Sequence, residues 1–206
     1  MRYTGPRNRL ARREGLDLNL KTFGSNAQAS LMRRMNIRPG QKPNARYSKI
    51  TEYGAQLREK QKIRRMYGLT ESQLHKYFKE SNKAVGNTST LLVERLELRL
   101  DNVVYRMGYA PTRASARQLV NHGHFQLNKK KATIPSQQVK VDDVVTLKNE
   151  KTASIPYVKE LLDQKNAALP TWLERKATAG KVVDKPGIES LGEEINLQAV
   201  IEFYSR

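Results

Sequence analysis

The sequence contains no cysteine, only three histidines and no long apolar run, and each absence excludes a class of protein. Without cysteine the chain forms neither a disulfide nor a thiolate metal site. His75, His122 and His124 have no further ligand at a metal spacing, so we expect no metal and no cofactor. No stretch approaches the ~20 apolar residues of a membrane span, and the first ten residues lack the apolar core of a signal peptide. We therefore expect a soluble protein without membrane contact.

Acidic residues are scarce in the first third of the chain. Residues 1–68 hold 17 Lys and Arg against 4 Asp and Glu, and thus carry +13 of the total charge of +18. Such a surface cannot neutralise itself, and it gains free energy by displacing counterions from a polyanion. The charge distribution predicts a nucleic-acid partner.

The length of 206 residues fits two small domains. Residues 1–45 are rich in Arg, Gly, Pro and Asn with weak periodicity, which indicates a basic arm or small irregular subdomain. We expect a helical domain over residues 46–90 together with 188–206, and a second domain over 91–187 with its core at 94–150.

Residues 53–67 predict an amphipathic helix that includes the core residue Tyr67. Arg58, Lys62 and Arg65 fall on the side opposite the apolar residues, and only Glu59 is close enough in sequence to pair with them. We expect this side to be exposed and to follow RNA phosphates, the alternative being a solvated polar face.

Three further helices are predicted by their capping residues and apolar spacing. Thr70 is placed to cap a helix that buries Leu74 and Phe78 and ends before the stretch 79–87. Residues 91–107 have apolar residues every three or four positions and predict one continuous helix. After a short turn, Thr112 is placed to cap a helix that runs through Asn121.

The apolar period then changes to two, which predicts a small antiparallel sheet from strands near 125–127, 134–141 and 145–147. Pro156 suits the first turn of a helix. Alternating apolar residues predict a closing strand at 197–204. The fold class is therefore expected to be α+β: a mostly helical first domain with a basic N-terminal arm, then helix, turn, helix and a small sheet.

The segment RLDNVVYRMGYAPTRASARQLVNHGHFQLN, residues 99–128, resembles the RNA-binding module named after the fourth protein of the small ribosomal subunit. That module also occurs in RNA-modifying enzymes and stress proteins, so alone it implies RNA binding and no more. The stretches 5–15, 53–68 and 200–206 resemble the bacterial ribosomal protein family itself. Over about nine tenths of the chain, the resemblance identifies it as a member of that family.

Membership implies a structural, ribosome-bound protein that binds 16S ribosomal RNA early and starts assembly of the 5′ domain and body of the 30S subunit. It further implies small-subunit protein five, and possibly protein three, as neighbours, mRNA at the channel through which it enters, and a contribution to translational accuracy. The implied location is the bacterial cytoplasm, with an organelle stroma or matrix as the alternative.

The resemblance also implies a set of RNA contacts by matching position. These are Arg7, Arg9, Arg12, Arg13, Arg58, Lys62, Arg65, Arg113, Arg117, His122, His124 and Asn128. The basic pattern and the face shared with Arg113 and Arg117 add Arg2, Arg46, Lys49, Asn121, Lys129 and Lys130. The alternative to RNA contact is simple solvation for the hairpin lysines and a helix-capping role for His122. A packed, not base-stacked, Trp172 is expected.

The sequence departs from the family at two places. Many relatives carry four zinc-binding cysteines in the arm, whereas here Asn8 and Ala11 replace the first pair. The arm must then be ordered by the helices behind it or by RNA, and we favour RNA. In the hairpin, Lys129 stands where Asn-Gly is common, which predicts a longer loop through Lys131.

Two alternatives to a ribosomal protein share the module. Arg99-Leu100-Asp101 is similar to the sequence around the catalytic Asp of pseudouridine synthases, but Asp101 falls inside a predicted helix, where an ion pair on the polar face explains it better. We therefore expect no enzyme and no catalytic residue. A non-ribosomal RNA-binding factor is the other alternative.

Overall fold

The computed structural model describes residues 3–40, 49–163, 169–192 and 195–206. The chain forms two compact units, one of Met1–Ser89 with Leu191–Arg206 and one of Thr90–Ser190. The described part of the first unit is helical, and the second combines helices with an antiparallel sheet, which confirms the predicted α+β class. That the units fold as separate domains, with the boundaries expected from the sequence, stays a prediction.

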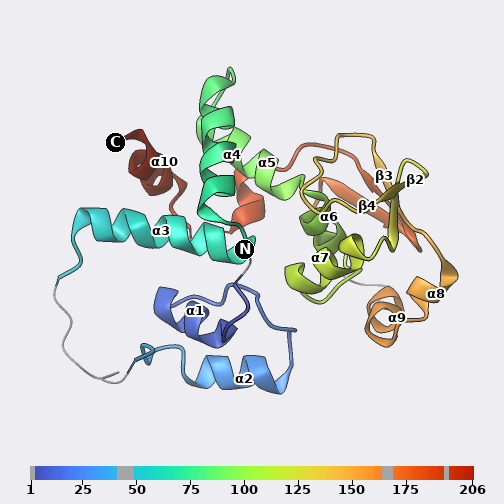
Figure 1. Cartoon of the computed structure of the whole chain (residues 1–206), viewed down its shortest axis with the longest axis horizontal. Helices are drawn as coiled ribbons and strands as arrows, with labels where there is room; N and C mark the ends of the chain where they lie inside the picture. The colour runs from blue at the N-terminus through green and yellow to red at the C-terminus, as the bar shows by residue number, and fades with distance from the viewer. Residues whose placement is uncertain (1–2, 41–48, 164–168, 193–194) are drawn as a thin grey trace. The chain divides into compact units, whose positions relative to one another are not determined.

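In the first unit, helix α3 has α1 along one side and α10 along another, while α2 packs on α1 and α4 contacts α10 (Figure 1). The helices of this unit are α1 (Arg7–Glu14), α2 (Asn26–Arg33), α3 (Glu52–Met66), α4 (Glu71–Lys83) and α10 (Leu197–Ser205). Thr70 caps α4 as predicted, through a reciprocal pair of hydrogen bonds with Gln73. Leu74, Phe78 and Tyr67 lie in the core, as expected.

The predicted closing strand at 197–204 is wrong, because these residues form α10. Asn196 begins the helix, its side-chain oxygen accepting a hydrogen bond from the Ala199 backbone N–H at 3.1 Å. Leu197 and Val200, three residues apart, are buried. A short apolar segment is compatible with both the period of two of a strand and the period of about 3.6 of a helix. Here the segment packs against α3 as a helix.

The arm is also more regular than its composition indicated, since α1 and α2 are formed and pack against each other. Asn8 donates a hydrogen bond to the carbonyl of Ala27 at 3.0 Å, and Ala11 is 1% exposed. Of the two residues that replace cysteines, Asn8 therefore fastens α1 to α2 by a hydrogen bond, and Ala11 is buried.

The second unit holds a five-stranded antiparallel sheet in the order β2-β1-β3-β5-β4. Its elements in chain order are α5 (Thr88–Glu97), which begins just before the unit, α6 (Leu100–Arg106), α7 (Arg113–Asn121), β1 (Phe125–Leu127), β2 (Lys130–Ala132), β3 (Val144–Leu147), α8 (Glu150–Ala153), α9 (Pro156–Asp163), β4 (Leu173–Lys176), β5 (Ala179–Val182) and η1 (Ile188–Leu191).

The sheet is not built from the strands that the sequence predicts. No strand forms at 134–141, where Ile134 is 60% exposed, whereas the hairpin of β4 and β5 completes the sheet and was not predicted. Trp172, just before β4, is 3% exposed in the hydrophobic core, which confirms that it packs. Pro156 begins α9 as predicted, and Val158 of that helix is fully buried.

The helix predicted over 91–107 is broken between α5 and α6. Arg99 has extended backbone angles (φ −69°, ψ 135°) and forms an isolated antiparallel bridge with Gln138. The backbone N–H groups of Leu100 and Asp101 donate to the carbonyls of Gln137 and Pro135, at 2.9 and 3.1 Å. These distant carbonyls replace partners within the helix, which periodicity alone does not reveal.

Candidate RNA-binding surface

Helix α7 presents one side of the module to solvent because its other side is fixed in the core. Thr112 caps it as predicted, its hydroxyl accepting a hydrogen bond from the Ser115 backbone N–H at 3.2 Å. Ala116, Leu119 and Val120 are buried, and Asn121 and His122 at the end of the helix are exposed. His122 is the C-cap residue, the position that its alternative, helix-capping role requires, and its expected contact with RNA stays a prediction.

Arg113, expected to contact RNA, instead lies inside the unit with 9% of its surface exposed. Its Nε donates to the Asn102 side-chain oxygen at 2.7 Å, and its guanidinium stacks over the Tyr105 ring at 4.6 Å. Arg113 therefore supports the fold and offers little surface to a partner. Next to this contact, Asn102 also donates a hydrogen bond to the buried Glu97, which accepts two more from Arg106.

Asp101 and Arg117 form a second internal pair. The buried Asp101 carboxylate accepts two hydrogen bonds from Arg99, at 3.1 and 3.0 Å, and one from Arg117 at 3.3 Å. The expected ion pairing of Asp101 is confirmed, but the residue is 5% exposed and not on a polar face. A carboxylate held in this way is not available as a nucleophile. The side chain of Arg117 keeps 25% of its surface exposed.

The β1–β2 hairpin is tighter than expected. Leu127 pairs with Lys130, so the loop has two residues, Asn128 (φ 49°) and Lys129 (φ 66°), and the predicted extension through Lys131 is wrong. The Asn128 side chain donates to Asp143 at 2.7 Å and accepts from the Val144 backbone N–H at 2.9 Å. These two bonds hold the turn in a conformation that usually requires Gly.

The hairpin also lies against the end of α7. Gly123 has a positive φ of 74°, and a Cβ added to it would lie 2.6 Å from Cε of Lys131. Lys131 therefore crosses over Gly123, next to His122. Lys129, Lys130 and Lys131 are exposed, and among the described residues they have no ion pair or side-chain hydrogen bond. The sequence predicts that these three lysines either contact phosphate or are merely solvated, and their exposure is compatible with both.

His124 follows the end of α7 and is partly buried. Its Nδ1 lies 2.9 Å from Oγ1 of the buried Thr152, and its ring centroid lies 6.1 Å from that of His122. Burial and the nearby His122 lower the pKa of His124 below the ordinary 6.5. The free protein therefore keeps this imidazole mostly neutral near pH 7.

The three cations expected on an exposed side of α3 are already paired. The buried Glu14 carboxylate of α1 accepts hydrogen bonds from Arg65 and, at 3.2 Å, from Arg58. Lys62 pairs with Glu59 at 2.7 Å. The expectation of an exposed side with only Glu59 to pair is therefore wrong. Burial lowers the pKa of Arg65, and Glu14 opposes that shift.

The arginines of α1 divide into two groups. Arg7 donates to the Leu20 carbonyl at 3.2 Å, and Arg12 donates to the carbonyls of Arg34, Ile37 and Arg38 at 3.1, 2.8 and 3.4 Å. Arg9 and Arg13 are exposed and form no hydrogen bond or ion pair with any described residue. Lys49 is exposed as well, whereas Arg2 and Arg46 lie outside the described residues.

The expected RNA contacts thus differ in how far their side chains are exposed to solvent. The exposed ones are Arg9, Arg13, Lys49, Asn121, His122, Asn128, Lys129 and Lys130. Across the described ranges, no group of three His, Asp or Glu could hold a metal ion. None of the helices described there is both long and apolar enough to cross a membrane.

Two family models match consecutive parts of the chain. Residues 2–97 match the model of the Ribosomal protein S4/S9 N-terminal domain, and residues 98–145 match that of the S4 domain. Proteins named small ribosomal subunit protein uS4 from Herpetosiphon aurantiacus, Trichlorobacter lovleyi and Geobacter sulfurreducens are 46%, 45% and 46% identical to this chain. Each alignment covers 100% of this chain and 99% of the relative. These matches, together with the capped α7 and the hairpin beside it, show that the chain belongs to the family of small ribosomal subunit protein uS4.

Proposed function

We propose that this chain is a structural, non-enzymatic component of the small ribosomal subunit that binds 16S ribosomal RNA. The observation that carries the proposal is the group of exposed lysines on the β1–β2 hairpin, set against the end of α7. Neighbouring cations without internal partners favour a phosphate-rich ligand. The pairing of Asp101 with Arg99 and Arg117 speaks against an RNA-modifying enzyme.

Two surfaces contribute in this proposal. The RNA-binding hairpin is defined as residues 128–131, with Asn121, His122 and His124 beside it. It lies at one edge of the sheet and reads the shape of the RNA backbone. Arg9, Arg13 and Lys49 add charge from the first unit. Arg117, partly exposed, is able to contact a phosphate while Asp101 holds it.

The finer role follows the resemblance. We infer an early binder of 16S ribosomal RNA in the assembly of the 5′ domain, next to small-subunit proteins five and three, near the channel through which mRNA enters, with an effect on translational accuracy. A bacterial cytoplasmic ribosome is the inferred location. Sedimentation tests this role against a free-standing RNA-binding factor: constant stoichiometry with 30S particles supports it, and release at moderate salt contradicts it.

Binding to a 16S 5′-domain transcript tests the RNA surface. Lys129→Gln with Lys130→Gln should reduce the slope of log affinity against log salt by about 1.4–1.8, or 0.7–0.9 for each lost phosphate contact. The control, Lys159→Gln with Lys176→Gln, removes the same charge from exposed residues outside the proposed surface and should leave the slope unchanged. Equal slopes for the two variants would remove the hairpin from the proposal.

A further inference from the structure

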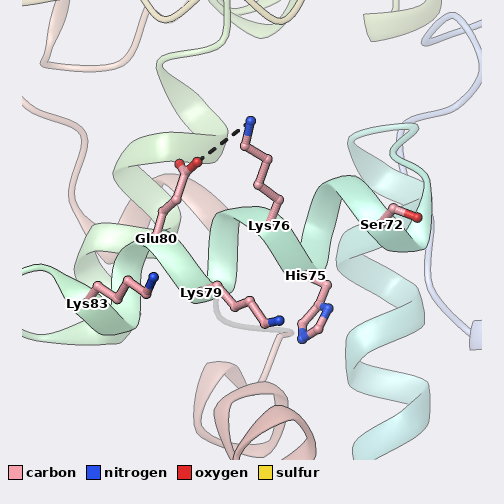
Figure 2. Close-up of a pocket in the computed structure, with 6 residues that line it drawn as sticks. All are labelled: Ser72, His75, Lys76, Lys79, Glu80 and Lys83. Atoms are coloured by element: carbon pink, nitrogen blue, oxygen red, sulfur yellow. Dashed lines mark ion pairs between the residues drawn. The ribbon is translucent and has the colours of Figure 1, made fainter.

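One side of α4 carries a row of basic residues that the expected RNA contacts do not include. The sequence placed the stretch 79–87 beyond the end of this helix, whereas α4 continues to Lys83. His75, Lys79 and Lys83 follow one another at intervals of four, so the helix aligns them in one row about 12 Å long. The side chain of Lys76 extends away from His75 and Lys79, toward Glu80 (Figure 2).

The charge of this row is not neutralised within the protein. Lys79 and Lys83 are exposed, and neither forms an ion pair or hydrogen bond with any residue in the described ranges. Lys76 is 74% exposed and meets Glu80 only at 3.9 Å. Like charges four residues apart on a helix repel each other. An anionic partner would therefore stabilise this side of α4.

Glu71, at the start of α4, does not pair with the lysines of that helix. It accepts hydrogen bonds from Lys60 at 2.9 Å and from the Tyr204 hydroxyl at 2.7 Å. Burial acts to raise the pKa of Glu71, but these two bonds, together with the charges of Lys60 and Arg64, outweigh burial and hold its pKa below the ordinary value. Glu71 is thus committed to α3 and α10 and does not offset the lysines.

The basic row borders an open hollow of about 320 Å³ (Figure 2). It is lined by Ser72, His75, Lys76, Lys79, Glu80 and Lys83. The His75 ring stacks on Tyr204, their centroids 5.4 Å apart, which fixes the imidazole at one end. Lys79 extends along the helix toward that ring in Figure 2. The hollow therefore offers a hydroxyl, an imidazole and ammonium groups, all of which can donate to phosphate oxygens.

We propose that the row of His75, Lys79 and Lys83 binds the phosphate backbone of a ribosomal RNA strand. This inference rests on the proposed function and adds a separate RNA surface in the first unit. Lysine is a compact point charge without the planar fork of arginine. The row therefore holds the backbone and contributes no base specificity.

Lys79→Gln with Lys83→Gln in the full chain tests the row against the 16S 5′-domain transcript. Glutamine keeps a good helix propensity, and circular dichroism checks that α4 remains folded. The salt slope should fall by about 1.4–1.8 between about 50 and 200 mM salt. The Lys159→Gln, Lys176→Gln control should retain the wild-type slope. Acetylation of lysines, read by mass spectrometry, should show Lys79 and Lys83 protected in the RNA complex.

The outcomes separate this inference from the proposed function. If the wild-type chain binds RNA through its hairpin while Lys79 and Lys83 stay reactive and the slope is unchanged, the row is not an RNA site, and the function stands. Protection that appears only in assembled 30S particles, without a crosslink from Lys79 or Lys83 to RNA in those particles, would mean that a protein covers the row, which also overturns the inference. If the wild-type chain does not bind the transcript, both proposals fail.

Discussion

Glu14 on α1 holds Arg65 on α3, 51 residues away in sequence, through a carboxylate that is fully buried. The same carboxylate accepts a hydrogen bond from Arg58 at 3.2 Å. One acidic residue thus pairs with two cations that the sequence indicated for RNA and offsets one of their two positive charges. It also fastens the arm to the helix behind it, so the arm does not depend on RNA alone for its order.

Glu14→Gln should loosen the arm. The substitution leaves two guanidinium groups without their counter-charge, and we expect the free energy of unfolding to fall by about 1–3 kcal/mol. This is less than the roughly 3–5 kcal/mol typical of a broken buried pair, because Arg58 is partly exposed. Urea unfolding and the rate of tryptic cleavage within α1 measure the effect. Glu160→Gln, an exposed residue without a described partner, is the control, and equal behaviour of both variants would contradict the proposed fastening.

Arg113→Gln should reduce stability without changing the salt dependence of RNA binding. The variant loses the bond to Asn102 and the stacking on Tyr105, and we expect a loss of about 2–4 kcal/mol. Thermal unfolding measures stability, and binding is measured below the transition. Arg9→Gln, at an exposed position, should behave in the opposite way, with a lower salt slope and unchanged stability. A reduced slope in a fully stable Arg113→Gln variant would return Arg113 to the RNA surface.

Lys129→Gly should weaken the salt dependence of RNA binding without lowering the stability of the fold. Lys129 has a φ of 66°, a conformation that glycine adopts without strain, so stability should stay equal or rise by up to about 1 kcal/mol. The salt slope should nevertheless fall by about 0.7–0.9 because one cation is lost. Chemical denaturation and RNA titration give the two numbers. A variant that keeps the full slope would show Lys129 to be merely solvated.

His124 should make both folding and RNA binding depend on pH. Its pKa is lowered in the folded protein, so between that value and the ordinary 6.5 the unfolded chain binds more protons, and stability rises as pH increases through this window. A bound polyanion should raise the pKa, which strengthens RNA binding as the pH falls. NMR titration of the imidazole with and without RNA tests this, and an unchanged His124 pKa in the complex would place RNA away from it.

A fragment of residues 88–190 should fold without the rest of the chain. The residues of its hydrophobic core all lie between Leu98 and Val182, and Arg106 donates to the carbonyl of Ser190 within the same fragment. We expect a cooperative thermal transition by circular dichroism. A fragment cut at the expected boundaries, 91–187, should unfold at a lower temperature because it lacks that carbonyl. Absence of a transition in the longer fragment would show that the two units depend on each other.

Local signals in the sequence were sufficient where both partners are close in the chain. Thr70 and Thr112 each cap a helix through a residue three positions later, and the structure contains both capping boxes. The predictions at 91–107, 128–131 and 197–204 were wrong where a distant partner intervenes. These partners are the carbonyls of Gln137 and Pro135 for α6, Asp143 and Val144 for the hairpin turn, and α3 for α10.

The amino-acid sequence by itself determined the excess of positive charge, the α+β class, the capped helices and the family. Only the tertiary structure decided which cations remain available to a partner, because a charge is neutralised by whatever carboxylate or carbonyl lies within a few ångströms, irrespective of its distance along the chain. Arg58, Arg65 and Arg113 are used internally, while the hairpin lysines and Lys79 and Lys83 on α4 are not.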